Sequence, residues 1–219
     1  MFQKFIYSFY LFCFSVHSVQ AQQGSSKHYD LAALLNAHQL ITTAANETHA
    51  LPNTVAGAIA TKGVVWLEGV SFKEGSIAID LRGKNVFQQS FLGIAFHGLD
   101  TTNYEALYFR PFNFHSADTL RKKHTVQYIS MPGYPWYKLR QEQPLVYENA
   151  VNPFPEPEEW FHAEIVVKGD SVTVYVNHSP IPSLKVRELD HGKGLKIGLW
   201  ADGLAGDFAD LTIKFSSSR

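Results

Sequence analysis

Residues 75–82 read GSIAIDLR and residues 91–97 read FLGIAFH, and these two stretches decide the fold class. Apolar and small or polar side chains alternate strictly in both. Because successive side chains of a β-strand point to opposite faces, this pattern is typical of a strand with one buried face. The expected core residues are Ile77, Ile79, Leu81, Leu92, Ile94 and Phe96.

The same period of two recurs along the chain. It is found in residues 104–110 (YEALYFR), 124–129 (HTVQYI), 163–168 (AEIVVK), 171–177 (SVTVYVN), 195–200 (LKIGLW) and 208–215 (FADLTIKF). Lys168-Gly169-Asp170 joins two of these runs as a short hairpin turn, in which Gly169 takes a positive φ. Residues 31–40 are the one stretch that reads as a short helix, or equally as the approach to a first strand. Many short strands without a βαβ rhythm predict an all-β sandwich or barrel.

The N-terminus has the pattern of a secretory signal peptide. Lys4 precedes a largely apolar run, residues 5–16, which is shorter than the roughly 20 residues that span a bilayer as a helix. The run is followed by Val19-Gln20-Ala21, which ends on a small residue. We therefore expect a signal peptide at residues 1–21 and one domain at residues 22–219, exported to the periplasm or the extracellular space.

Composition excludes several classes of function. Cys13 is the only cysteine and lies in the expected signal peptide, so the mature domain has no disulfide and no thiolate chemistry. The formal net charge is −1, from 19 basic and 20 acidic residues, which gives no electrostatic case for nucleic acid or an anionic membrane. No later apolar run reaches membrane length, so membrane insertion is not expected.

One segment interrupts the alternation. Residues 111–160 are rich in proline, which argues against central strands over most of this length, and they are also rich in aromatic residues. Loops on a rigid scaffold often carry binding groups. We expect this segment either to pack over the sandwich or to line a site, and the sequence leaves open whether it covers that site.

The chain resembles the concanavalin A-like lectin/glucanase superfamily. The resemblance rests on residues 72–83 (FKEGSIAIDLRG), 91–97, 104–113 (YEALYFRPFN), 126–128 (VQY), 195–201 (LKIGLWA) and 206–211 (GDFADL). Within the superfamily it is similar to bacterial exported proteins grouped with the 3-keto-disaccharide hydrolase domain and to laminin-G-like modules. The resemblance implies an antiparallel two-sheet β-sandwich, a jelly roll, over nearly the whole mature chain. It leaves the activity open, since one fold hosts many functions.

The polar face of the predicted sheet is the expected binding site. If the alternating apolar residues fill the core, then Asp80, Arg82 and His97 project from the opposite, concave face. Gly93 and Ala95 are small and leave space there for a ligand.

The strand at residues 104–110 extends this face. Tyr108 and Arg110 share one side of it, whereas Glu105 lies on the other side, either buried and paired or exposed at the strand's entry. Sugars offer hydroxyls to polar groups and apolar faces to aromatic rings, which suits this mixture. The candidate ligand-binding residues are Asp80, Arg82, Tyr108, Arg110, Asn113, Gln127, Trp136, Arg140 and Glu148. In the alternative, the arginines only tie the loops down by ion pairs; these would join Arg82, Arg110 and Arg140 to Asp80, Glu105 and Glu148.

Binding and catalysis both stay open at this point. The Glu-x-Asp-x-x-Glu motif of the superfamily's glucanases is absent, although Glu105 and Glu148 can converge from separate segments. The hydrolase resemblance implies cleavage of a 3-keto-glycoside by elimination, with His97 or Glu105 as the base. The alternatives are a non-catalytic lectin-like module that binds a carbohydrate and a laminin-G-like interaction module.

No cofactor is expected. The 10 histidines show neither HxH nor HExxH spacing, so no transition-metal site is predicted. Asp202, Asp207 and Asp210 could hold a structural calcium ion, although capping of turns is the preferred explanation.

Overall fold

The structure is a computed structural model that describes residues 24–42, 47–189 and 194–216. The predicted signal peptide and Cys13 therefore lie outside the described residues. Among the helices that are described, none is long and apolar enough to cross a bilayer.

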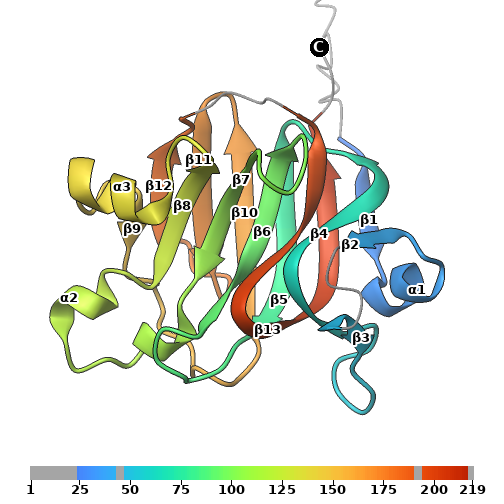
Figure 1. Cartoon of the computed structure of the whole chain (residues 1–219), viewed down its shortest axis with the longest axis horizontal. Helices are drawn as coiled ribbons and strands as arrows, with labels where there is room; N and C mark the ends of the chain where they lie inside the picture. Colours follow the sequence, from blue (N-terminus) through green and yellow to red (C-terminus); the bar gives the residue numbers. More distant parts are fainter. Residues whose placement is uncertain (1–23, 43–46, 190–193, 217–219) are drawn as a thin grey trace, which may run out of the picture.

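The described chain is dominated by strands (Figure 1). In chain order the elements are β1 (Ser26–Tyr29), α1 (Leu31–Asn36), β2 (Leu40–Thr42), β3 (His49–Ala50), β4 (Ile59–Ser71), β5 (Gly75–Arg82), β6 (Ser90–Gly98), β7 (Tyr104–Phe109), η2 (Pro111–Asn113), α2 (Thr119–Lys122), β8 (Val126–Met131), α3 (Trp136–Glu142), β9 (Glu148–Asn149), β10 (Phe161–Lys168), β11 (Ser171–Val176), β12 (Leu184–Arg187) and β13 (Lys196–Phe215).

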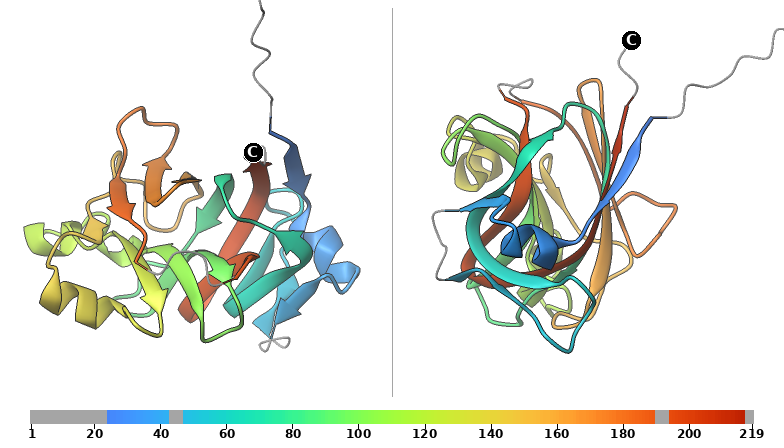
Figure 2. Two further views of the ribbon diagram at one scale, coloured as in Figure 1. Left: turned by 90° about the horizontal axis from the view of Figure 1, so that it is seen from above. Right: turned by 90° about the vertical axis from the view of Figure 1, so that its right-hand side faces the viewer.

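The strands form two antiparallel layers joined by the long strand β13. Its first half pairs with β4 and β6, and β7, β8 and β9 extend this layer, which we call the front sheet. Its second half pairs with β1 and β5, and β10, β11 and β12 extend the other layer, the back sheet. The two layers face each other when the molecule is viewed from its side (Figure 2). This confirms the predicted all-β sandwich.

The core between the sheets consists of the residues that alternate in the sequence. The six predicted core residues on β5 and β6 are all fully buried. Rings from the two sheets meet directly, as Phe109 of β7 packs against Phe161 of β10 with 5.1 Å between ring centroids. Each such large side chain contributes about 1.5–3 kcal/mol by leaving water, so the core is the main source of stability.

The two longest strands differ from the sequence-based expectation, and the short strands β1, β2, β3, β9 and β12 were not predicted either. β4 was not predicted, because its buried residues fall in two unbroken runs, 59–61 and 64–67, that do not alternate. The runs at residues 195–200 and 208–215 were predicted as two strands, and they are the two halves of β13. The helix alternative for residues 31–40 is confirmed for Leu31–Asn36, where the Asp30 carboxylate accepts a hydrogen bond from the Ala33 backbone at 2.8 Å.

The proline-rich segment adds one more central strand and a wall. β8 lies between β7 and β9, and the short helix α3 follows Pro135 and lies beside β8 at one side of the front sheet (Figure 1). The predicted hairpin is confirmed, since Lys168 pairs with Ser171 and Gly169 has a φ of +61°.

Candidate functional site

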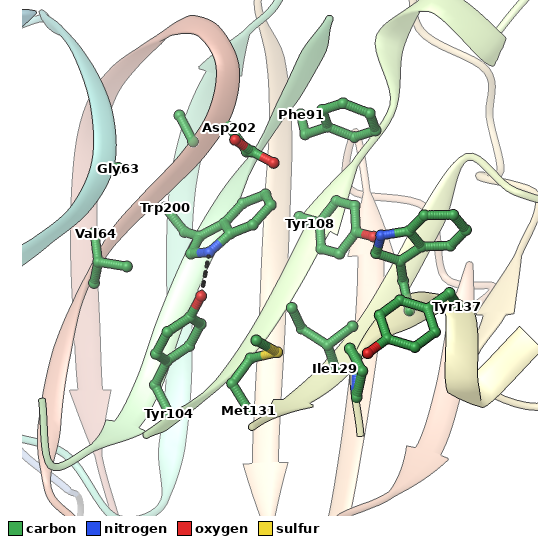
Figure 3. A pocket seen from close by; sticks show the side chains of 13 residues that line it. Gly63, Val64, Phe91, Tyr104, Tyr108, Ile129, Met131, Tyr137, Trp200 and Asp202 are labelled. Atoms are coloured by element: carbon green, nitrogen blue, oxygen red, sulfur yellow. Dashed lines mark hydrogen bonds between the residues drawn. The ribbon is translucent and has the colours of Figure 1, made fainter. Parts of the chain in front are cut away.

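The outer face of the front sheet carries an aromatic groove of about 400 Å³ (Figure 3). Strands β4, β13, β6, β7 and β8 form its floor, and the start of α3 forms one wall. The lining residues are Gly63, Val64, Phe91, Tyr104, Tyr108, Ile129, Met131, Pro135, Trp136, Tyr137, Trp200, Ala201 and Asp202. Six of these side chains are aromatic, and Asp202 supplies the one carboxylate in this lining.

The middle of the floor is a pair of packed rings. Trp200 and Tyr108 flank Gly93 on the two neighbouring strands, and their ring centroids lie 4.6 Å apart. Gly93 has no side chain to separate the rings, and a Cβ there would lie 2.0 Å from the Leu107 carbonyl oxygen. The indole Nε1 of Trp200 donates to the Tyr104 hydroxyl at 3.1 Å, which fixes the orientation of the indole. The floor is therefore a fixed pair of aromatic rings, tilted by 33° against each other.

A buried polar group holds Tyr108 from below. Arg110 donates from Nη2 to the Tyr108 hydroxyl at 2.7 Å, and the same nitrogen donates to Oε1 of Gln127. All three side chains are nearly or fully buried. Burial raises the pKa of Tyr108 to about 12, although the charge of Arg110 acts in the opposite direction. The phenol is therefore neutral at ordinary pH and its ring is held in place.

A second set of contacts holds the wall. The guanidinium of Arg140 lies over the Trp136 ring, 5.0 Å from its centroid, and is bound at the same time to the buried carboxylate of Glu148. His124 Nδ1 lies 2.7 Å from the same carboxylate. Burial lowers the pKa of His124 more than Glu148 raises it. Trp136 itself is 46% exposed, so its ring is available to a ligand.

The structure brings together six of the nine predicted ligand-binding residues. These are Tyr108, Arg110, Gln127, Trp136, Arg140 and Glu148. Only Tyr108 and Trp136 line the groove, whereas the other four contact these two rings or each other without lining it. The alternative reading of the arginines is correct for Glu148, which binds Arg140 and lies 3.8 Å from Arg110, whereas Arg82 pairs with Asp207.

Asp80 and Arg82 lie elsewhere, and their predicted placement on one face with His97 is wrong. Both are on β5, which belongs to the back sheet. Asp80 Oδ1 is 2.8 Å from Nδ1 of His162, and Arg82 pairs with Asp207 at 2.8 Å. The sequence shows alternation along each strand, but not which sheet a strand joins.

Asn113 is also outside the groove. It belongs to η2 and is 5% exposed.

His97 points into the interior because of a β-bulge. The register of β6 against β13 shifts between Ala95 and Gly98, and His97 has a φ of +49°. The shift reverses the side that alternation predicts, so that His97 meets Glu105, which faces the interior of the sandwich. Both are buried, and neither lines the groove. A catalytic role for this pair stays a prediction.

The three aspartates considered for calcium have separate partners. Asp202 accepts from the Gly203 backbone at 2.8 Å, Asp207 pairs with Arg82, and Asp210 lies 3.3 Å from His28. They do not form a group of possible metal ligands in the described part of the chain.

Sequence reasoning missed much of the groove lining. Trp200 and Asp202 are two residues apart on β13 and so share a face, which is a signal that the sequence contains. Their position opposite Tyr108 depends on the pairing of β13 with β6, which one sequence does not show.

Comparison with known proteins identifies the fold. No family model matches the chain, and no curated protein matches it. A protein of unknown function with a galectin-like fold from Bacillus subtilis is similar in structure, with a TM-score of 0.57 and 13% identity over 90% of this chain and 99% of that chain. The carbohydrate binding module CBM66 from Bacillus subtilis has a TM-score of 0.50 and 12% identity, over 72% and 86% of the two chains.

The exoplasmic/lumenal domain of VIP36, in its Ca²⁺/Man3GlcNAc-bound form, has a TM-score of 0.51 and 9% identity over 84% of this chain and 86% of that chain. Together these structures show that the chain has a galectin-like, concanavalin A-like β-sandwich. At such low identities they show the fold alone.

Proposed function

We propose that this protein binds a carbohydrate in the aromatic groove of the front sheet and does so without cleaving it. The observation that carries the proposal is the packed floor of Trp200 and Tyr108, with Trp136 on the wall and the Asp202 carboxylate at the edge. A sugar ring has an apolar C–H face that packs on such rings, and hydroxyls at its rim that donate to a carboxylate. The groove's volume of about 400 Å³ suits one or a few sugar units.

The fold supports this proposal by precedent. One structure with the same fold is a carbohydrate binding module, and another is bound to Man3GlcNAc. Because fold does not fix function, the proposal depends on the groove itself.

The positions of the carboxylates favour binding over hydrolysis. A glycosidase usually needs two carboxyl groups on either side of the bond that it cleaves. Among the described residues that line the groove, Asp202 is the only acid, and the carboxylate of Glu148 is already bound by Arg140. Hydrolysis of a 3-keto-glycoside, which the sequence resemblance implies, therefore stays an alternative function that product analysis can test.

A glycan array followed by calorimetry tests the proposal. We expect a binding signal for the mature protein, and a loss of about tenfold or more in affinity for Trp136→Ala, because this variant removes one stacking surface. Trp136 is half exposed, so the variant should fold normally. Phe154→Ala, which removes another exposed aromatic ring outside the groove, is the matched control.

The outcomes separate the candidate functions. Absence of binding to any glycan, or equal affinity of Trp136→Ala and the wild type, would contradict the proposal. Release of product from a bound glycan or from a 3-keto-glucoside would replace binding by hydrolysis. Protein partners captured without any glycan signal would favour the interaction-module alternative.

We also propose that the domain works after export, on the basis of the signal-peptide pattern in residues 1–21. Expression of the full chain in a bacterial host should give a mature protein that begins at Gln22. N-terminal sequencing of the periplasmic and cytoplasmic fractions measures this, and an uncleaved cytoplasmic chain would contradict it.

A further inference from the structure

A second cluster of chemically capable side chains lies between the two sheets, away from the groove. It consists of His97 at the end of β6, Glu105 at the start of β7 and Glu188 just after β12. Thus two members come from the front sheet and one follows a strand of the back sheet, which lies behind it in Figure 1. Their exposed fractions are 4%, 2% and 5%. A buried imidazole beside two buried carboxylates is costly unless a cation neutralises them.

The distances in this cluster are too long for good hydrogen bonds. His97 Nδ1 lies 3.5 Å from Oε2 of Glu105 and 3.6 Å from Oε1 of Glu188, whereas a charged N–H···O bond is about 2.7–2.9 Å long. Neither oxygen of Glu105 makes a hydrogen bond of good geometry among the described residues, although the Tyr128 hydroxyl lies near enough to interact with this carboxylate, and Nδ1 of His97 makes no such bond either. Direct contacts among these three side chains therefore leave the Glu105 carboxylate unsatisfied.

The same distances match the edges of a metal-coordination shell. Metal–ligand bonds of about 2.1 Å in tetrahedral geometry place neighbouring ligand atoms about 3.4 Å apart. The ligand atoms of all three residues lie within 4.8 Å of one another. An ion placed among these atoms would meet one nitrogen and two carboxylate oxygens once the side chains close around it.

His97 has the orientation of a metal ligand. Its Nε2 lies 2.7 Å from the Lys73 carbonyl oxygen, which can only accept, so the hydrogen is on Nε2. Nδ1 can then present its lone pair to the two carboxylates. A backbone carbonyl that binds the second ring nitrogen is the usual way in which proteins orient a metal-binding histidine.

The apolar surroundings of the cluster increase the stabilisation that a bound cation would provide. Phe72 stacks on the His97 ring with centroids 6.2 Å apart, and Phe96 packs against it at 5.0 Å. Glu105 and Glu188 approach the same imidazole nitrogen, at 3.5 and 3.6 Å, so the two carboxylates lie close together. A divalent ion would relieve the repulsion between the carboxylates, and the low dielectric would strengthen its binding.

We propose that His97, Glu105 and Glu188 bind one divalent transition-metal ion that ties the front sheet to the chain following β12. Zn²⁺ fits best, because it accepts imidazole nitrogen and carboxylate oxygen in a small tetrahedral shell. Ca²⁺ fits poorly, because it requires six to eight oxygen ligands. A water or a second carboxylate oxygen completes the shell. The site does not depend on the proposed carbohydrate binding, and it cross-links a domain that has no cysteine in its described residues.

Metal titration of the mature protein tests the site. Protein stripped with a chelator should bind one equivalent of Zn²⁺, and its Tm should rise by about 5 °C or more with excess ion. Ca²⁺ at the same concentration should leave the Tm unchanged. An equal Tm with Zn²⁺ and with chelator would overturn the proposal and would leave a proton-sharing cluster in its place.

Two variants locate the binding. Glu105→Gln should abolish the Zn²⁺ response, and it should not lower the Tm of the stripped protein, because it removes an unsatisfied buried charge. His115→Gln is the matched control, since it removes an exposed histidine that lies 3.3 Å from Glu156, and it should retain the full response.

Anomalous diffraction keeps the test decisive if Glu105→Gln fails to fold. A zinc peak among the three side chains of the wild type would support the proposal. Peaks at surface histidines alone, or binding lost in His115→Gln, would overturn it.

Discussion

Arg140 of α3 donates two hydrogen bonds to Glu148 of β9, from Nε to Oε1 at 3.0 Å and from Nη2 to Oε2 at 2.6 Å. The geometry is that of a bidentate guanidinium–carboxylate pair, which fixes orientation as well as distance. Because α3 carries Trp136 and Tyr137 into the groove, this pair sets the position of the groove wall.

Replacement of Arg140 by methionine should loosen the wall while the sandwich stays folded. Arg140 is partly exposed, so we expect a loss of about 1–2 kcal/mol in unfolding free energy. Backbone amides of residues 136–142 should exchange faster in hydrogen–deuterium exchange, and glycan affinity should fall severalfold. Gln141→Met, an exposed change on the same helix, is the control. Unchanged exchange in α3 would show that packing alone holds the helix.

Replacement of Gly93 by alanine should damage the groove floor. A Cβ would lie 2.0 Å from the Leu107 carbonyl oxygen, so β6 and β7 must separate or slip. We expect a destabilisation of about 2 kcal/mol or more in urea unfolding, together with a change in the near-ultraviolet circular dichroism of Trp200 and Tyr108. The matched change Gly133→Ala meets no atom within 4 Å and should have little effect. Equal stability of the two variants would refute this account of the floor.

The sequence was sufficient for most of the long strands and for the side of β5 and of most of β6 that faces the core, although it missed β4. Ile77, Ile94 and their alternating neighbours are buried as expected, because burial of one face is the cause of the alternation itself. Alternation does not report which strands share a sheet. For that reason Asp80 was assigned to the same face as His97, although the two lie on different sheets.

Local irregularities limited the prediction of the sites. The positive φ of His97 turns its side chain inward, and the residue that takes this φ is not a glycine, so the sequence gives little warning. Glu188 approaches Glu105 from a strand end that is distant in the chain, and ligands so far apart have no recognisable spacing. The groove likewise depends on the register of Trp200 against Gly93, which only the three-dimensional pairing defines.

Replacement of Asp202 by asparagine should weaken carbohydrate binding without loss of stability. The carboxylate is exposed at the edge of the groove and can accept hydrogen bonds from two sugar hydroxyls. Loss of its charge should lower affinity by about fivefold to tenfold, as for other hydrogen bonds to charged groups. Calorimetry with the best glycan measures the change, and Glu158→Gln, at another exposed acid, is the control. Equal glycan affinity of Asp202→Asn and the wild type would show that the ligand does not contact Asp202.

Stability should depend on pH through His162 on the back sheet. Its Nδ1 lies 2.8 Å from Asp80, and the hydrogen bond between them raises the pKa of His162. Burial lowers this pKa, but by less, and the charges of Glu164 and Asp210 add smaller increases. A histidine whose pKa is higher in the folded state stabilises fully below its ordinary value of about 6.5, and this contribution is lost as pH rises through the folded pKa. At pH 5.5 the wild type should therefore have a higher unfolding free energy than His162→Gln. The difference should be less than about 1 kcal/mol, because the pair is partly exposed, and it should shrink by pH 8.5. Urea unfolding at the two pH values measures this, and a difference that stays constant or grows with pH would contradict the assignment. In an Asp80→Asn background the pH-dependent part should disappear, because the partner that raises the pKa is then neutral.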